Sequence, residues 1–287
     1  MSSLLWYICL SGISFAAAAF AIYNKRHLYK TSTLVVFYLF SSCLSWIGEF
    51  IVLGVFNSYA YKPNLFSDPW AENLTGHLLL NCTMFPAAAI LMVTYSLKYI
   101  GIIFIIAFFI FAEYFFVKLG IYNQHWWKYY MSVINTVAFL VITKKWFHKM
   151  THMKSRLTRA TVFYFVAFII IHFPIPLLLL YGKQYYSLSF VDNLVGNLYR
   201  SSIIFIFTYH LIECFLIVYL VCILDNRIWK LAAFAVSIAG QSVLAKVNIL
   251  VFQNGWNLLY LNLVYIITLS IFILIERHTL KQSSNKL

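Results

Sequence analysis

Long runs of apolar residues, separated by short polar stretches, follow one another from end to end of the chain. A helix needs about 20 mainly apolar residues to cross about 30 Å of hydrocarbon, whereas strands of a membrane β-barrel alternate apolar and polar residues over about ten positions. The runs are continuous and do not alternate, so they favour helices. We expect nine transmembrane helices over residues 4–23, 32–56, 77–98, 100–120, 128–146, 161–181, 199–223, 230–250 and 257–275.

The composition supports this class of protein. Of the 287 residues, 63% are hydrophobic and 10% are charged, while an ordinary soluble domain is about 45–50% apolar and about 25% charged. Aromatic residues make up 20% of the chain, in keeping with the enrichment of Tyr and Trp at membrane interfaces. We therefore predict an all-α integral membrane protein in contact with membrane lipids.

The placement of the basic residues predicts the orientation of the chain. A net charge of +13 could suggest nucleic acid, but the basic residues lie between the apolar runs, so no nucleic-acid partner is expected. Nine spans put fifteen Lys and Arg residues on one side and four on the other, Lys62, Lys128, Lys183 and Arg200. Because cytoplasmic loops carry the excess of Lys and Arg, we predict an outer N-terminus and a cytoplasmic C-terminus.

The first apolar run differs from a cleaved signal peptide. Such a peptide carries its positive charge before the apolar stretch, whereas here Lys25 and Arg26 follow it. We expect a retained helix. Aromatic residues gather at the predicted outer ends of the helices, and most of them are expected to be interfacial anchors. They include Tyr59, Tyr61, Trp70, Trp126, Trp127, Tyr129, Tyr130, Tyr185, Tyr186 and Trp256.

Two stretches of the chain share a sequence pattern that predicts an internal repeat. Both contain a polar quartet that ends in Trp, follows one apolar helix and opens another. An even number of helices in each repeat gives both copies the same orientation, so they would be parallel repeats related by an axis along the membrane normal. We predict an N-terminal helix in residues 1–30 and four-helix repeats in 31–148 and 149–287. The two quartets are Asn123-Gln124-His125-Trp126 and Gln253-Asn254-Gly255-Trp256.

The first repeat resembles a small multipass membrane family of unknown function that is common in endospore-forming bacteria. The residues that carry the resemblance are Asn73, His77, Pro86, Glu113, the quartet Asn123-Gln124-His125-Trp126, and Asn135. In the second repeat, Asn254-Gly255-Trp256-Asn257 resembles another copy, although that copy lacks the Pro and the Glu, and His125 replaces the expected Gly in the first. The resemblance implies a bacterial cytoplasmic membrane and a link to sporulation, and it brings no activity.

Ionisable residues inside the apolar runs are the candidates for function. Such residues are costly in hydrocarbon, usually face the interior of a helix bundle, and often mark a site. Glu113 and Glu213 lie well inside their helices, whereas Glu49 lies nearer a helix end and receives less weight. His210 and Glu213 are three residues apart and share a helix face. The candidate intramembrane polar site is Glu113, His210, Glu213, Gln241 and Lys246.

The role of the His210–Glu213 pair stays open at this point. The pair could relay a proton or supply two metal ligands, or it could simply tie its helix to a neighbour by hydrogen bonds. A di-metal bundle would need further pairs of this kind, which the sequence lacks. Snorkelling of the side chain to the interface is the simpler interpretation of Lys118, while Lys246 lies deeper and could find an internal partner. His172 precedes Pro174 and Pro176, which should break or kink the sixth helix.

Three functions remain compatible with the sequence. A transporter or channel for a small ion or solute would fit the repeat, the buried carboxyl groups and the broken helices. A membrane-embedded enzyme that modifies lipids would use His210 or Glu213 as an acid or base. A non-catalytic membrane scaffold connected with sporulation would fit the short loops. No catalytic, nucleotide-binding, cofactor or metal motif is present in the sequence, so we favour the transporter and expect no cofactor.

Overall fold

The chain forms two compact units, Met1–His152 and Met153–Leu287, named unit 1 and unit 2. The computed structural model describes residues 2–153, 155–224 and 226–280. The boundary falls close to the predicted one at residue 148, and the helix predicted as a separate domain in residues 1–30 belongs to unit 1. Lys154, Lys281 and Lys286, which count toward the predicted charge asymmetry, lie outside the described residues.

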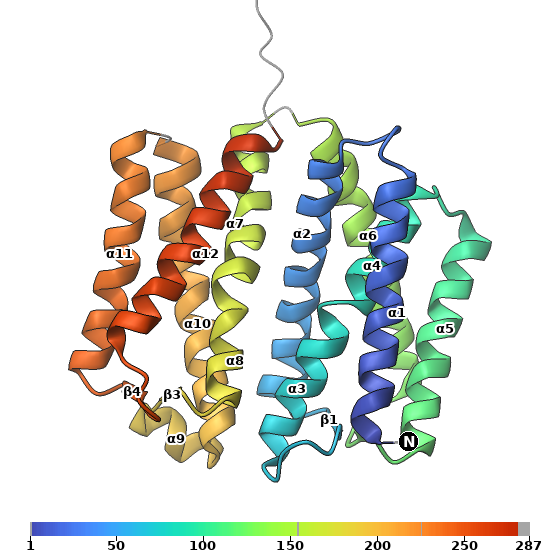
Figure 1. Cartoon of the computed structure of the whole chain (residues 1–287). Coiled ribbons are helices and arrows are strands. Elements are labelled where there is room, and N and C mark those ends of the chain that lie inside the picture. Colours follow the sequence, from blue (N-terminus) through green and yellow to red (C-terminus); the bar gives the residue numbers. More distant parts are fainter. Residues whose placement is uncertain (1, 154, 225, 281–287) are drawn as a thin grey trace, which may run out of the picture. The chain divides into compact units, whose positions relative to one another are not determined.

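Both units are helical, and each has one pair of short strands (Figure 1). The elements of unit 1 are α1 Ser3–Asn24, α2 Thr31–Glu49, the π-helical turn η1 Phe50–Val55, β1 Tyr59–Tyr61, α3 Pro69–Asn81, α4 Met84–Thr94, α5 Tyr99–Lys118, β2 Tyr122–Gln124 and α6 Tyr129–Thr151. The elements of unit 2 are α7 Arg156–His172, α8 Pro174–Leu180, β3 Gln184–Tyr186, α9 Ser189–Val195, α10 Leu198–Val218, the π-helical turn η2 Tyr219–Leu224, α11 Arg227–Lys246, β4 Leu250–Phe252 and α12 Leu258–His278.

In unit 1, α4 is the central helix. It packs against α1, α2, α5 and α6, and α3, which precedes it in the chain, packs against β1. β1 and β2 are antiparallel, with Tyr61 opposite Tyr122. The core next to the strands contains Tyr7, Leu80 and Phe116, which hold α1, α3 and α5 together. The strand pair therefore closes one end of the helix bundle.

In unit 2, α7 lies between α10 and α12, and α11 packs against α12. β3 and β4 are antiparallel, with Tyr186 opposite Leu250. At the other end of α12, the buried carboxylate of Glu276 forms ion pairs with Arg159 Nη1 at 2.7 Å and with Lys230 Nζ at 3.2 Å. These charges tie α7, α11 and α12 together at the end away from the strands.

The break predicted at Pro174 and Pro176 is observed, and Pro86 lies just after a second break. α7 ends at His172 and α8 begins at Pro174, because a proline ring has no N–H to donate and clashes with the preceding turn. Pro86 lies in the first turn of α4, directly after the break between α3 and α4, where a missing N–H costs little. Each break lets the chain change direction inside a predicted span.

The predicted start of the third helix at residue 77 is wrong, because α3 begins at Pro69. The carboxylate of Asp68 accepts hydrogen bonds from the N–H groups of Trp70 at 2.8 Å and Ala71 at 3.0 Å. Such a cap satisfies N–H groups that the first helical turn leaves unpaired, and Pro69 suits the first helical position. The local capping signal therefore outweighs the polarity of residues 69–76, which had suggested a loop.

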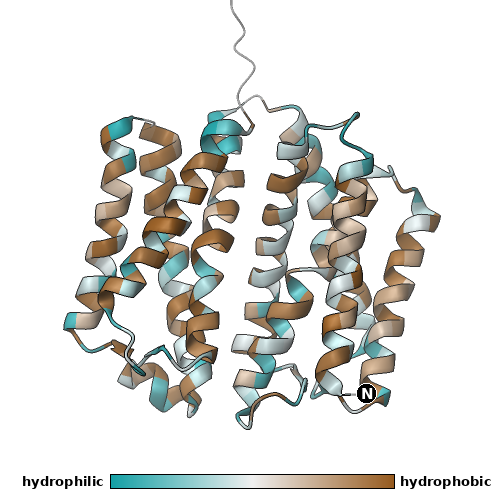
Figure 2. Cartoon of the chain, viewed as in Figure 1, coloured by the Kyte–Doolittle hydropathy of each residue, from teal (hydrophilic) through white to brown (hydrophobic). Residues whose placement is uncertain are grey.

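Within the described residues, eight helices are long and apolar enough to cross a membrane, and this indicates an α-helical membrane protein. Figure 2 shows hydrophobic residues along these helices and hydrophilic residues mainly at their ends and in the connections. α6 is 23 residues long but carries Lys144, Lys145 and Lys149, and it is not one of the eight. The eight are Ser3–Asn24, Thr31–Val55, Pro69–Thr94, Tyr99–Lys118, Arg156–Leu180, Leu198–Leu224, Arg227–Lys246 and Leu258–His278.

Candidate functional site

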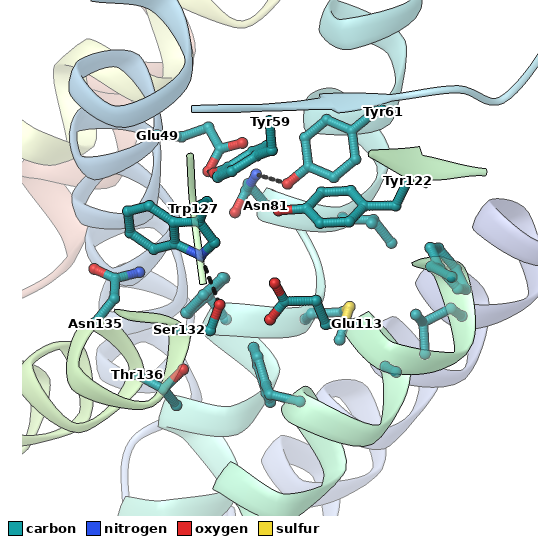
Figure 3. A pocket seen from close by; sticks show the side chains of 17 residues that line it. Glu49, Tyr59, Tyr61, Asn81, Glu113, Tyr122, Trp127, Ser132, Asn135 and Thr136 are labelled. Atoms are coloured by element: carbon teal, nitrogen blue, oxygen red, sulfur yellow. Dashed lines mark hydrogen bonds between the residues drawn. The ribbon is translucent and has the colours of Figure 1, made fainter. Parts of the chain in front are cut away.

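Unit 1 contains a cavity of about 100 Å³ between its helices and its strand pair. Figure 3 shows the side chains around it. One part of the lining is polar and contains two carboxyl groups, and the other part is apolar. The polar part consists of Glu49, Tyr59, Tyr61, Asn81, Glu113, Tyr122, Trp127, Ser132, Asn135 and Thr136. The apolar part consists of Leu10, Leu80, Met84, Phe85, Phe109, Ala112 and Phe116.

The strand pair places three tyrosines at the cavity. Side chains two residues apart in a strand point to the same face, so Tyr59 and Tyr61 lie together, and Tyr122 lies opposite Tyr61 in the register. The ring centroid of Tyr122 is 5.1 Å from that of Tyr59 and 5.3 Å from that of Tyr61. α3 passes so close to β1 that a Cβ atom on Gly76 would overlap the side chain of Tyr61. Gly76 therefore allows β1 to pack directly on the helix.

Glu49 is the last residue of α2, and its carboxyl group is buried at the cavity with one oxygen unpaired. Its Oε2 accepts a hydrogen bond from the Tyr59 hydroxyl at 2.6 Å. Its Oε1 makes no hydrogen bond of good geometry to a described residue, although Glu49 is only 9% exposed and the side chains of Tyr61 and Asn81 lie near the carboxyl group. A buried polar atom without a partner costs about 1–3 kcal/mol, and more for a charged group. Glu49 therefore offers one acceptor to a molecule in the cavity.

Asn81, near the end of α3, lies beside Glu49 in the lining. Its Oδ1 accepts a hydrogen bond from Ser45 Oγ at 3.0 Å. Its Nδ2 lies 3.1 Å from His77 Nδ1 and 3.5 Å from the Tyr61 hydroxyl. These contacts fix the orientation of the amide group, because the oxygen contacts α2 and the nitrogen contacts β1 and another residue of α3. Asn81 thus links α2, α3 and β1 at the polar side of the cavity.

Glu113 reaches the same cavity from α5 (Figure 3). Its Oε1 accepts a hydrogen bond from Gln124 Nε2 at 2.7 Å, and the residue is half-buried. Lys118, one of the partners expected for Glu113, is exposed at the last residue of α5. The carboxyl group is therefore held by a neutral amide at the edge of the strand pair.

The cavity lining contains two acidic side chains and no Lys, Arg or His. Burial raises the pKa of the Tyr59 and Tyr61 hydroxyls well above the usual value, and the neighbouring Glu49 carboxyl adds to the rise. Burial likewise raises the pKa of Tyr122. The three hydroxyls stay neutral, so they can donate to a carboxylate and accept from a cation. The lining is suited to positive charge.

Unit 2 contains a buried chain of hydrogen-bonding side chains. His172 Nδ1 lies 2.8 Å from His210 Nδ1, and His210 Nε2 lies 2.7 Å from the Tyr265 hydroxyl. Gln241 Nε2 donates to the same hydroxyl at 2.8 Å. Both nitrogens of His210 are engaged, so the direction of each hydrogen bond depends on which nitrogen carries the proton. This chain joins α7, α10, α11 and α12.

Glu213 lies beside this chain but is not part of it. Its Oε2 is 3.6 Å from His210 Nε2, a separation too long for a hydrogen bond. Glu213 is 4% exposed, and neither carboxyl oxygen has a hydrogen-bond partner among the described residues. The spacing of three residues does bring His210 and Glu213 to one face of α10, and His172 and Tyr265 are the partners that complete the network.

The predicted site residues fall into two separate groups. Glu113 lies in unit 1, while His210, Glu213 and Gln241 lie together in unit 2. Lys246 is exposed at the last residue of α11, two residues past the buried Leu244. A functional role of these residues stays a prediction. The sequence interpretation missed the tyrosine cluster, because Tyr59 and Tyr61 look like interfacial anchors until β1 places them in the interior.

The Tyr265 hydroxyl is expected to stabilise unit 2. Replacing Tyr265 with Phe leaves His210 Nε2 and Gln241 Nε2 without their shared partner. We expect the free energy of unfolding to fall by about 1–3 kcal/mol, as for other buried polar groups that lose a partner. Tyr260→Phe is the matched control, since Tyr260 is 46% exposed on the same helix. Denaturant unfolding of the purified variants measures both, and equal stability of the two would contradict a structural role for the network.

No protein-family model, curated protein or solved structure matches the chain. The family resemblance in the sequence therefore stays a prediction. The chemistry of the unit 1 cavity is the observation from which a function can be inferred.

Proposed function

We propose that this membrane protein binds a small cation in the unit 1 cavity and carries it across the membrane as a transporter or channel. One observation carries the proposal. Glu49 from α2 and Glu113 from α5 line the same cavity, and the lining contains no basic side chain. Buried carboxylates are normally paired with a positive charge or bound to a metal. A mobile cation is the partner that the cavity leaves room for.

The position of the two carboxyl groups fits this role. Acidic residues in membrane helices usually face the bundle interior or a water-filled space and mark pathways for ions and substrates. The helix that carries Glu49 changes at that residue from α2 to the π-helical turn η1, and such turns are frequent at functional sites. A smaller cavity of about 30 Å³ also has Glu49 and Asn81 in its lining. Polar groups therefore extend beyond the main cavity.

Binding should appear as stabilisation of the protein by particular cations. A ligand that binds only the folded state at 100 times its dissociation constant raises the free energy of unfolding by about 2.7 kcal/mol. We expect the melting temperature of the purified protein to rise in a saturable way with one class of monovalent cation, at constant ionic strength. Glu49→Gln should remove this rise. If no cation shifts the melting temperature beyond the effect of ionic strength, the proposal is wrong.

We also propose that the two units are tandem copies of one fold. When each broken span counts as one helix, the part of unit 1 after α1 has the order helix, strand, helix, helix, strand, helix. Unit 2 has the same order, with α9 added after β3. Matching contacts support this. The N–H of Tyr61 donates to Asn73 Oδ1 at 2.7 Å, and the N–H of Tyr186 donates to Ser202 Oγ at 3.0 Å. Just beyond β1, Lys62 N donates to Ile121 O at 2.9 Å; just beyond β3, Ser187 N donates to Ile249 O at 2.8 Å.

The orientation that we propose has nine crossings, with α6 as the ninth. At 1.5 Å per residue a helix of 23 residues is about 35 Å long, enough to cross the hydrocarbon. Its three lysines lie in its last third, where they can reach the interface. The excess of basic residues then places the C-terminus in the cytoplasm. A bacterial cytoplasmic membrane is the location that the family resemblance implies.

Labelling of single cysteines tests this orientation. In a variant without the native cysteines, Met153→Cys should react only after permeabilisation of the cells, because it precedes α7 on the proposed cytoplasmic side. Phe190→Cys in α9 should react with an impermeant maleimide in intact cells, because α9 follows β3 at the opposite end of unit 2. Labelling of both cysteines from the same side would contradict the proposed orientation.

A further inference from the structure

The unit 1 cavity has two chemically different parts. The unpaired Oε1 of Glu49 and the Tyr59 hydroxyl lie in its polar part, while Met84, Phe109 and Phe116 line its apolar part. A bare inorganic cation needs oxygen ligands on every side, and the apolar part supplies none. A ligand with a charged head and an apolar body would match both parts.

The size of the cavity leads to the same class of ligand. A single water needs roughly 10–15 Å³ of such volume, so about 100 Å³ exceeds what one dehydrated ion would fill. Several waters would then have to accompany an inorganic ion, and those next to Met84 and Phe116 would lack hydrogen-bond partners. An alkyl chain of a few carbon atoms could occupy that space without this loss.

From these observations we infer that the ligand is a small organic cation, an ammonium group on a short alkyl chain. This inference rests on the proposed function, and it names the chemical class of the cation. The ammonium N–H groups donate to Glu49 Oε1 and to the Glu113 carboxylate, and the alkyl chain packs against Met84 and Phe109. The rings of Tyr59 and Trp127 add an attraction for a cation that comes within about 6 Å of them.

Unit 2 has a larger side chain at the helix position that corresponds to Thr136 in the proposed repeat. Thr136 is the eighth residue of α6 and lines the cavity, while the eighth residue of α12 is Tyr265. The Tyr265 side chain is buried, and its hydroxyl contacts His210 and Gln241. A tyrosine at this helix position is therefore compatible with a packed bundle. Thr136→Tyr should fill the unit 1 cavity in a similar way.

Calorimetric titration of the purified full-length protein tests the inference. The probes are methylammonium, propylammonium and butylammonium chloride, with butanol as the neutral analogue and NaCl and KCl as inorganic cations. We expect one butylammonium to bind per chain. Each added methylene should raise the affinity about fourfold until the cavity is full, and butanol should bind at least about tenfold more weakly because it has no charge for Glu49 and Glu113.

The variants locate the binding site. Thr136→Tyr should lower butylammonium affinity at least about tenfold, while Val137→Tyr, at the adjacent position that is 40% exposed, should leave it unchanged. If Thr136→Tyr does not fold, Met84→Ala provides the second test. It should shift the best ligand to a longer alkyl chain, because it enlarges the apolar part of the cavity.

The possible results separate this inference from the proposed function. Saturable binding of Na⁺ or K⁺ that Glu113→Gln removes, without binding of butylammonium, would overturn the inference and leave the proposed function standing. Equal affinity for butanol and butylammonium would also overturn it, since the carboxyl groups would then play no part. Unchanged affinity in Thr136→Tyr or an unchanged chain-length preference in Met84→Ala would place binding elsewhere. Absence of binding by every cation would overturn both proposals.

Discussion

Replacing Glu113 with Gln is expected to lower the affinity for the cation by about 30-fold or more, with little change in stability. Loss of one partner of a buried charge pair costs about 2–5 kcal/mol, which corresponds to that factor or a larger one. The stability should be kept, because a glutamine side chain can still accept the hydrogen bond from Gln124 Nε2. Calorimetric titration gives the affinity, and denaturant unfolding gives the stability.

A neighbouring variant serves as the control for Glu113→Gln. Tyr114 is 51% exposed on the same helix, so Tyr114→Phe should change neither the affinity nor the stability. Glu49→Gln should behave like Glu113→Gln, since its side chain can still accept from the Tyr59 hydroxyl. If Glu113→Gln destabilises the protein and leaves the affinity unchanged, Glu113 has a structural role instead.

The largest loss of stability is expected for Glu276→Gln in unit 2. The carboxylate is 3% exposed and forms ion pairs with Arg159 and Lys230. Removing one partner of a buried ion pair costs about 3–5 kcal/mol, and we expect about 3 kcal/mol because Lys230 retains some contact with solvent. Arg159 also donates to the carbonyl groups of Glu276 at 2.6 Å and Leu280 at 3.0 Å. Glu276→Gln removes the charge that holds Arg159 beside these carbonyl groups, so the last turn of α12 should become less stable.

Unfolding of Glu276→Gln in denaturant, beside Arg277→Gln, tests this expectation. Arg277 is the next residue and is exposed, so its substitution should change the free energy of unfolding by no more than about 0.5 kcal/mol. A similar small change for Glu276→Gln would mean that the ion pairs contribute little. Cation affinity should be the same in both variants, because the cavity belongs to unit 1.

The helices could largely be predicted from the sequence, while some of their ends could not. Long apolar runs identify membrane helices because hydrocarbon tolerates few other structures. A helical turn made of polar residues cannot be told from a loop by its hydrophobicity. α3 begins at Pro69 because Asp68 caps it and because Glu72 accepts hydrogen bonds from the N–H groups of Leu65 and other residues of the preceding loop. These contacts satisfy backbone N–H groups at the start of α3 and in the loop before it, and a hydrophobicity pattern does not predict them.

The candidate site could be predicted only in part. Glu113 and Glu213 stand out because a carboxyl group is rare within an apolar run, and Glu213 is indeed buried. The strand pair, in contrast, could not be predicted from the sequence. β1 and β2 have three residues each, too few for an alternating pattern to be recognised. Without the strands, nothing in the sequence shows that Tyr59 and Tyr122 join the two glutamates around one cavity.

Uptake of a labelled cation by proteoliposomes tests the central claim most directly. The vesicles contain wild-type protein, Glu113→Gln or no protein, and labelled methylammonium is the probe. We predict that wild-type protein accelerates entry in a saturable way, that excess butylammonium inhibits it, and that Glu113→Gln reduces it to the rate of protein-free vesicles. Equal uptake rates in all three preparations, with correctly folded wild-type protein in the vesicles, would contradict the claim that this protein carries a cation through its unit 1 cavity.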